Sequence, residues 1–184
     1  MHRLPLILTL ALAALAACAA EDDAPDADVQ LEPIGASGVD GTVSFTLLGE
    51  GKVRIDADIT GLTPGKHGMH VHEWGDCSGE GGMAAGGHFN PDGVDHGAPD
   101  TATHHAGDFG NIEADADGHV VFSGTFGTGT FSLGQDKYSV LGRAIIIHEK
   151  PDTYGQPTGD AGGRLACGVV QIAGGGTEPV LPPA

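Results

Sequence analysis

The stretch TVSFTLLGEGKVRIDADI, residues 42–59, decides the fold class, because it alternates apolar and polar side chains on both sides of a turn. Such alternation is typical of β-strands with one buried face. The apolar set that shares this face consists of Val43, Phe45, Leu47, Val53, Ile55, Ala57 and Ile59. Gly49-Glu50-Gly51 in the middle is a hairpin turn signal. The stretch therefore predicts two antiparallel strands, residues 42–48 and 53–59.

Further short strands are expected after this hairpin, with turns rather than helices between them. The chain has 32 glycines, only 5% aromatic residues and no long stretch of helical periodicity. The expected strands are residues 68–73, 109–114, 119–124, 139–148 and 167–172. We therefore predict an all-β fold, a Greek-key antiparallel β-sandwich or flattened barrel of about eight strands.

Two long irregular segments interrupt the expected strands. Residues 75–108 are rich in Gly, Pro, Asn and Asp, and residues 149–163 form a second irregular stretch. Loops of this length are uncommon unless they serve a function or are disordered. The first segment contains a cluster of histidines and the second directly follows His148, so we expect both to be functional loops.

The composition indicates a single acidic domain. The chain has 184 residues, 40% of them hydrophobic, and a formal net charge of −17. A chain of this length suits one hydrophobic core. The negative charge repels nucleic acid and anionic membrane surfaces, so no nucleic-acid partner is expected.

Residues 1–17 have the features of an export signal. Their apolar run, residues 4–17, is shorter than the roughly 20 residues that a membrane-spanning helix needs. Leu15-Ala16-Ala17-Cys18 resembles the bacterial lipobox, in which the cysteine is lipidated and becomes the mature N-terminus. We therefore expect a periplasmic lipoprotein whose acyl chain on Cys18 anchors it to an envelope membrane, with the outer membrane preferred. The alternative is an ordinary signal peptide cleaved near Ala20.

The remaining chain divides into three expected segments. Residues 18–35 are expected to be a lipidated acidic linker, because they carry too little apolar surface to fold alone. Residues 36–173 are expected to form the folded domain, and residues 174–184, rich in Gly and Pro, a disordered tail.

The three cysteines are consistent with export. If Cys18 carries the lipid, Cys77 and Cys167 remain, and in an oxidising compartment such a pair is expected to form a disulfide. Closing so long a loop stabilises a fold by roughly 3–5 kcal/mol in the chain-entropy treatment.

Seven of the ten histidines fall between His67 and His105, which indicates metal binding. In His70-Val71-His72 the two imidazoles point to one face if the segment is a strand. His148 ends the apolar run at residues 144–147 and is either a satisfied core histidine or a partner of this pair. A site of three or four imidazoles without thiolates favours copper.

A second set of possible ligands lies within the first long loop. His88, His96, His105 and Asp108 supply three imidazoles and one carboxylate that could surround one ion. This combination of ligands suits tetrahedral zinc.

The order and spacing of these motifs resemble the copper/zinc superoxide dismutases. The matching segments are HGMHVHEWGDC at 67–77, GHFNP at 87–91, HGAP at 96–99, HAGDFGN at 105–111, HEK at 148–150 and GRLACG at 163–168. The likeness runs from about Thr42 to about Ile172. It implies copper and zinc as cofactors, and dismutation of superoxide to dioxygen and hydrogen peroxide as antioxidant defence in the cell envelope.

The resemblance also implies the role of each matching residue. Copper would be bound by His70, His72, His88 and His148. Zinc would be bound by His88, His96, His105 and Asp108, so that His88 bridges the two metals. Asp152 would accept the remaining N–H protons of His70 and His96 and fix the orientation of both rings.

Two residues are implied beside the substrate. Arg164 would face superoxide next to the copper, and Thr158 would line the channel. His88 would act in catalysis as well, by leaving the reduced copper and carrying a proton. A guanidinium suits the role of Arg164 because it stays charged and donates several hydrogen bonds.

The sequence departs from the eukaryotic pattern in the second loop. The interval from His148 to Arg164 is 16 residues, as in the shorter loop of bacterial members, and Pro157 stands where eukaryotic members carry a lysine. Because the chain is so negative, we expect superoxide to be attracted only by local positive charges at the entrance to the copper site. The candidate cations are Lys66, Lys137, Lys150 and Arg164.

Two other functions fit the sequence less well. A non-catalytic copper/zinc-binding envelope protein would need fewer ligands and no Arg164, and a surface binding module would use metals for stability alone. The sequence is compatible with a monomer and with a homodimer. The histidines expected to bind no metal are His2 in the leader, His67 and His119 at the surface, and His104 beside a ligand.

Overall fold

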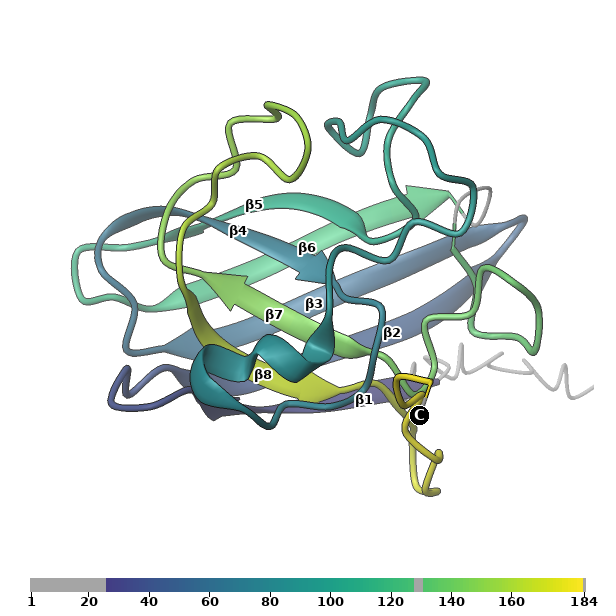
Figure 1. Cartoon of the computed structure of the whole chain (residues 1–184), viewed down its shortest axis with the longest axis horizontal. Helices are drawn as coiled ribbons and strands as arrows, with labels where there is room; N and C mark the ends of the chain where they lie inside the picture. Colours follow the sequence, from purple (N-terminus) through teal and green to yellow (C-terminus); the bar gives the residue numbers. More distant parts are fainter. Residues whose placement is uncertain (1–25, 128–130, 184) are drawn as a thin grey trace, which may run out of the picture.

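Nine β-strands, joined by turns and two long loops, make up most of the part of the chain that the computed structural model describes, residues 26–127 and 131–183 (Figure 1). The strands are β1 (Ala27–Pro33), β2 (Asp40–Gly49), β3 (Lys52–Thr60), β4 (Gly65–Val71), β5 (Asp108–Ala114), β6 (Val120–Gly127), β7 (Ala144–His148), β8 (Arg164–Val169) and β9 (Gln171–Ile172). A single 3₁₀ helix within this part, η1 (Glu80–Ala85), lies in the first long loop.

All strand pairs are antiparallel, and their order is β5-β4-β7-β8-β1-β2-β3-β6, with β9 beside β1. The two ends of this path, β5 and β6, follow each other along the chain, so the sheet curls into a nearly closed barrel. The pairs β3–β6, β4–β7 and β1–β8 are not consecutive in sequence, which gives the Greek-key connections. The predicted all-β fold is confirmed.

The hairpin at residues 42–59 forms in the predicted register. Val43 pairs with Ala57 and Phe45 with Ile55, and all four side chains are buried in the core. Leu47 is half-exposed, because a register shift between Leu47 and Gly49 interrupts the pairing at the end of the hairpin.

The prediction of an unfolded linker over residues 18–35 is wrong for its C-terminal part. β1 pairs with β2 on one side and with β8 on the other, and so joins two portions of the barrel. Ala27, Val29 and Leu31 are buried, while the polar residues between them are exposed. The sequence shows this alternation, but the many Asp and Glu residues of the segment led to the prediction of a linker instead. Residues 18–25 lie outside the described residues.

The C-terminal segment is not a loose tail either. Gly75 donates its backbone N–H to the carbonyl of Val180 at 2.7 Å, and Val180 donates to Gly142 at 2.7 Å. The segment therefore lies against the start of the first long loop. Residue 184 and the predicted signal peptide, residues 1–17, lie outside the described residues.

Several strand boundaries differ from the prediction, among them the starts of β7 and β8. β7 begins only at Ala144, because residues 139–143 form turns in which Val140 donates a backbone hydrogen bond to Ser132. β8 begins earlier than expected, at Arg164, so this side chain is held at the start of a core strand.

The two long loops lie at the same side of the barrel. Figure 1 shows the later part of the loop from β4 to β5 in teal and the loop from β7 to β8 in yellow-green projecting above the strands, while η1, in the earlier part of the first loop, is drawn near β8. β4 lies between β5 and β7 in the sheet, so both loops arise from neighbouring strands. Helices long and apolar enough to cross a bilayer are absent from the described residues.

Candidate metal centre

Neighbouring strands bring the predicted ligands together. His70 on β4 pairs with Asp108 on β5 and with Ile146 on β7, two residues before His148. The loop after β4 then returns beside the strand, and His88 forms a β-bridge with His72. Ligands that are up to 78 positions apart in sequence therefore meet at one end of β4.

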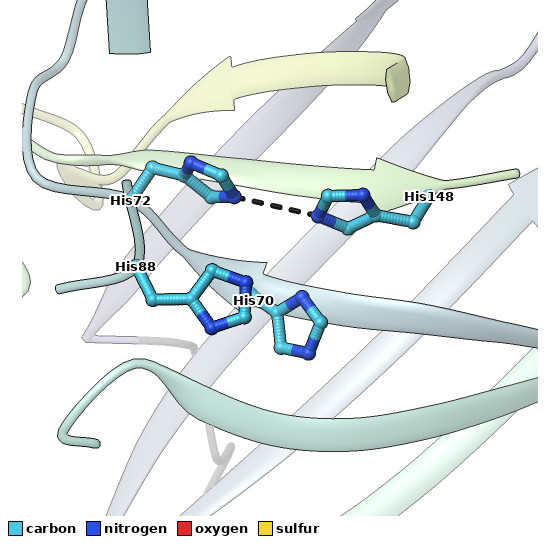
Figure 2. A group of neighbouring side chains, drawn as sticks. All are labelled: His70, His72, His88 and His148. Atoms are coloured by element: carbon cyan, nitrogen blue, oxygen red, sulfur yellow. Dashed lines mark hydrogen bonds between the residues drawn. The ribbon is translucent and has the colours of Figure 1, made fainter. Parts of the chain in front are cut away.

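The first group consists of four buried histidines whose possible ligand atoms all lie within 4.8 Å of one another. Its members are His70, His72, His88 and His148. Figure 2 shows the four rings grouped together, with the dashed contact of 3.4 Å joining Nε2 of His72 to Nε2 of His148. No sulfur or carboxylate belongs to this group, which is the set of ligands that favours copper.

The second group surrounds the carboxylate of Asp108. Nδ1 of His88 and Nδ1 of His105 lie 3.0 Å and 3.2 Å from Oδ1, and Nδ1 of His96 lies 2.9 Å from Oδ2. Tetrahedral zinc with bonds of about 2.0–2.1 Å holds its ligands about 3.3 Å apart. The observed separations are close to that value, so these four residues suit zinc.

His88 belongs to both groups. Its Nδ1 faces Asp108, while its ring lies beside that of His70 in a tilted arrangement, with centroids 4.0 Å apart. It lies in the first long loop, where the backbone of Phe89 donates to Val71 and that of Gly107 donates to Phe89. A residue so fixed can present one nitrogen to each group.

Hydrogen bonds decide which nitrogen of each ring is available to a metal. His70 donates from Nε2 to Asp152 at 2.8 Å, and His72 donates from Nδ1 to the carbonyl of Gly86 at 3.0 Å. His96 donates from Nε2 to Asp152 at 3.0 Å. The other nitrogen of each ring lies within its group, where it can bind a metal when it carries no proton.

Three ring nitrogens of the two groups have no well-aligned hydrogen bond within the described residues. Nδ1 of His70, His96 and His105 is buried without a hydrogen bond, although Nδ1 of His96 and His105 lies close to Asp108. A buried polar atom without a partner is costly unless something satisfies it. All three atoms belong to the two groups, which is the pattern expected of metal ligands.

Asp152 lies where the sequence predicts it, between the two groups. It accepts hydrogen bonds from His70 and His96, and it is itself held by Asn111. The side-chain amide of Asn111 accepts from the backbone N–H of Asp152 at 2.7 Å and donates to its carbonyl at 2.9 Å. Asn111 therefore positions the carboxylate that orients a histidine in each group.

Burial gives the first group low proton affinity. It lowers the pKa of His88 to about 4 and that of His148 to about 3, and it holds the pKa of His72 well below its usual range. Neighbouring imidazoles lower these pKa values further, because two adjacent rings cannot both be charged cheaply. The rings of these three histidines are therefore neutral at physiological pH, as metal binding requires.

In the second group, the neighbouring carboxylates raise the pKa of a histidine instead of leaving it lowered by burial. Burial would lower the pKa of His96, but the adjacent carboxylates of Asp108 and Asp152 raise it to about 9. Burial would likewise raise the pKa of each carboxyl, but hydrogen bonds from histidines hold both pKa values well below their usual range. Asp108 and Asp152 are thus fully ionised and present a negative charge to any cation.

The first group opens into a pocket of about 380 Å³. His72, His88 and His148 line it, together with Arg164 and Thr158. The Arg164 guanidinium donates to the carbonyls of two loop residues, Gly82 at 2.7 Å and Gly86 at 2.6 Å. Arg164 and Thr158 thus lie where the resemblance placed them, beside the first group.

The disulfide between Cys77 and Cys167 is confirmed. It spans 90 positions and joins the first long loop to β8, three residues after Arg164. The bridge and the hydrogen bonds of Arg164 therefore hold the same loop segment against the same strand.

His67 contradicts the expectation of a surface histidine. Its side chain is buried, with Nδ1 2.8 Å from the carbonyl of His148 and Nε2 2.8 Å from the carbonyl of Thr63. β4 is buried on both faces from His67 onward. The polar ring of His67 therefore needs hydrogen-bond partners inside the protein. His67 thus supports the backbone of a ligand, a role that no sequence motif signalled.

Sequence reasoning also missed Gln156. Its side-chain amide donates to the carbonyl of His96 at 2.8 Å and accepts from the N–H of His96 at 3.0 Å. The contact joins the two long loops. A single glutamine in an irregular segment carries no spacing signal that would predict it.

The remaining predictions have mixed outcomes. His104 is partly buried and lies in neither group, and His119 is paired with Asp58 at the surface. Of the four candidate steering cations, Arg164 alone is among the pocket-lining residues, and Lys137 is paired with Asp92. His2 lies outside the described residues.

Comparisons with known proteins agree with this geometry. A family model described as copper/zinc superoxide dismutase matches residues 39–170. Superoxide dismutase (Cu-Zn) 2 from Brassica juncea is 44% identical over 152 residues, which cover 76% of this chain and 93% of that protein. A solved structure of the clock protein EA4 has a TM-score of 0.72 and 38% identity, and covers 80% of this chain and 95% of its own. The chain therefore belongs to the copper/zinc superoxide dismutase family, an oxidoreductase family that uses both metals to dismutate superoxide.

Proposed function

We propose that each histidine group holds one metal of this dismutase. Copper is held by His70, His72, His88 and His148, and zinc by His88, His96, His105 and Asp108. The observation that carries this assignment is the shared His88, which belongs to an imidazole-only group beside a pocket and to a carboxylate-containing group away from it. The four ligands of the second group would complete the coordination of a zinc ion, whereas the first group adjoins the pocket where a small anion can enter.

Copper, when bound, supplies the electron exchange that turns two superoxide ions and two protons into dioxygen and hydrogen peroxide. The chain supplies the rest of the site. Arg164 presents a fixed positive charge that attracts and orients the anion beside the histidines. His88 presents a ring nitrogen to the same group, where it can hold a proton for the product. Asp152 keeps the rings of His70 and His96 in their orientation.

A dismutation assay on the metal-loaded protein tests this assignment. We expect Arg164→Ala to lower kcat/KM about tenfold or more with copper content unchanged, because the variant removes a charge that meets the substrate. Arg54→Ala, which removes a charge on β3, is the control and should keep full activity. Equal activity of the Arg164 variant and the wild type would contradict the role of the arginine.

The enzyme is further proposed to act in the bacterial cell envelope, as a lipoprotein anchored through Cys18. The apolar run and lipobox-like segment support this, although both lie outside the described residues. Since β1 begins at Ala27, the tether from Cys18 has eight residues and spans at most about 28 Å. The domain would therefore remain close to the membrane surface.

Mass analysis of the mature N-terminus tests the anchor. An acylated Cys18, with the protein in the membrane fraction and released from it by Cys18→Ala, is the expected result. A mature protein that begins downstream of Cys18 and is recovered in the soluble fraction would contradict it.

A further inference from the structure

The pocket beside the first histidine group contains two charged side chains of opposite sign. Among its lining residues, Arg164 contributes a guanidinium and Asp160 a carboxylate, while the histidines are neutral at physiological pH. Both long loops contribute to the walls, and Asp160 lies in the second, two positions after Thr158. The substrate is an anion, so the two charges act on it in opposite directions.

Asp160 and Arg164 differ in how far their charges are compensated. Arg164 is half-buried and donates to two backbone carbonyls, whose dipoles offset part of its charge. Asp160 is exposed, and the salt bridges formed by Lys or Arg in the described chain pair Arg54 with Asp56 and Lys137 with Asp92. Asp160 therefore lines the pocket and takes part in neither of those ion pairs.

We propose that Asp160 opposes Arg164 and weakens the entry of superoxide and other small anions into the pocket. Its carboxylate belongs to the lining of the same pocket as Arg164, so its charge acts on an anion that enters there more strongly than a charge elsewhere on the surface does. This inference rests on the proposed copper ligands, because the anion must reach that group.

Asp160→Asn removes this charge with little risk to the fold. The residue has a φ of 53°, a left-handed conformation that Asn tolerates as well as Asp. The matched control is Asp117→Asn, which changes the net charge equally but lies in the exposed turn between β5 and β6, outside the pocket lining. The comparison of the two variants separates a local effect from that of total charge.

The first measurement is kcat/KM for superoxide of both copper- and zinc-loaded variants over a range of ionic strength. We expect Asp160→Asn to exceed the wild type about twofold or more at low salt, and the gain to shrink as salt screens the carboxylate in the wild type. The Asp117 variant should remain within about 20% of the wild type throughout. Equal rates for the two variants would overturn the proposal.

The second measurement is independent of turnover. Azide binding to the copper(II) protein, followed by visible spectroscopy, should tighten about twofold or more in Asp160→Asn and stay unchanged in Asp117→Asn. A variant that reacts more slowly while azide affinity is unchanged would show that Asp160 assists the reaction instead, and would overturn the proposal. Absence of azide binding to copper-loaded wild type would overturn the proposed copper site as well as this inference.

Discussion

The two histidine groups share one residue but differ in charge and in access. The first contains only imidazoles, burial lowers the pKa values of His88 and His148 in it, and it adjoins a pocket that also holds Arg164. The second is built around the ionised Asp108, and its His96 has a raised pKa. One framework thus produces a neutral site next to an anionic one, and the difference suits a reactive copper beside a structural zinc.

Removal of the shared residue should have the largest effect. We expect His88→Ala to weaken binding of both metals and to lower dismutation at least about 100-fold, because each group loses a ligand. Metal content by mass spectrometry and the dismutation rate measure both effects. The control is His104→Ala, which lies in neither group and should retain both metals. If the His88 variant kept its full zinc content, the claim that His88 is a ligand of both metals would be wrong.

The opposite pKa shifts of the two groups make the stability of the metal-free protein depend on pH. Because His88 and His148 have folded pKa values of about 4 and about 3 against an ordinary 6.5, unfolding takes up protons as the pH falls below 6.5. His96, whose pKa is raised to about 9, stabilises the fold below pH 6.5 and loses this effect as the pH rises through 9. Stability should therefore be greatest near pH 6.5.

Urea unfolding of chelator-treated protein with its disulfide intact measures this dependence. Each of the two low-pKa histidines contributes a slope of up to about 1.4 kcal/mol per pH unit, so the free energy of unfolding should fall by at least about 3 kcal/mol from pH 6.5 to 4. The slope should decrease in His148→Gln. A stability that stays constant over this range would contradict the neutral, buried state of the first group.

Asp152 is the residue through which the two groups can be disturbed together. Asp152→Asn should weaken copper and zinc binding about 10- to 100-fold each, since the amide cannot accept the N–H protons of both His70 and His96. Competition with a chelator gives both affinities, and Asp100→Asn in the first long loop is the control. Loss of affinity for only one metal would show that the carboxylate serves one group alone.

Gln156 should have the smallest effect, and one limited to the second group. Gln156→Ala removes both hydrogen bonds to the backbone of His96, so zinc affinity should fall about 3- to 10-fold while copper affinity is unchanged. The exposed Gln135→Ala is a matched control. An equal fall in copper affinity would mean that the groups are coupled more tightly than their geometry indicates.

Local patterns explain which parts of the molecule could be predicted from the sequence. The alternation at residues 42–59 predicted β2 and β3, and the His70-Val71-His72 pattern predicted two rings on one face. β1 was missed because its acidic residues concealed a regular alternation. The prediction of a disordered tail failed because Val180 pairs with backbone that is distant in sequence.

The supporting residues of the site could not be predicted, for a related physical reason. His67, Asn111 and Gln156 act through hydrogen bonds to the backbone of residues that are distant in sequence. Such contacts depend on how the loops fold back over the barrel, which leaves no periodic signal. Asp160 is similar, because its charge becomes relevant only once Arg164 is seen to line the same pocket.

Diffraction from crystals of the copper- and zinc-loaded protein, with anomalous data at both metal edges, tests the central claim most directly. We expect two separate metal peaks, with one nitrogen of the His88 ring about 2.0–2.1 Å from each. His70, His72 and His148 should surround the copper peak, and His96, His105 and Asp108 the zinc peak. A ring of His88 that contacts only one ion, or a His148 ring turned away from His70 and His72, would contradict the account.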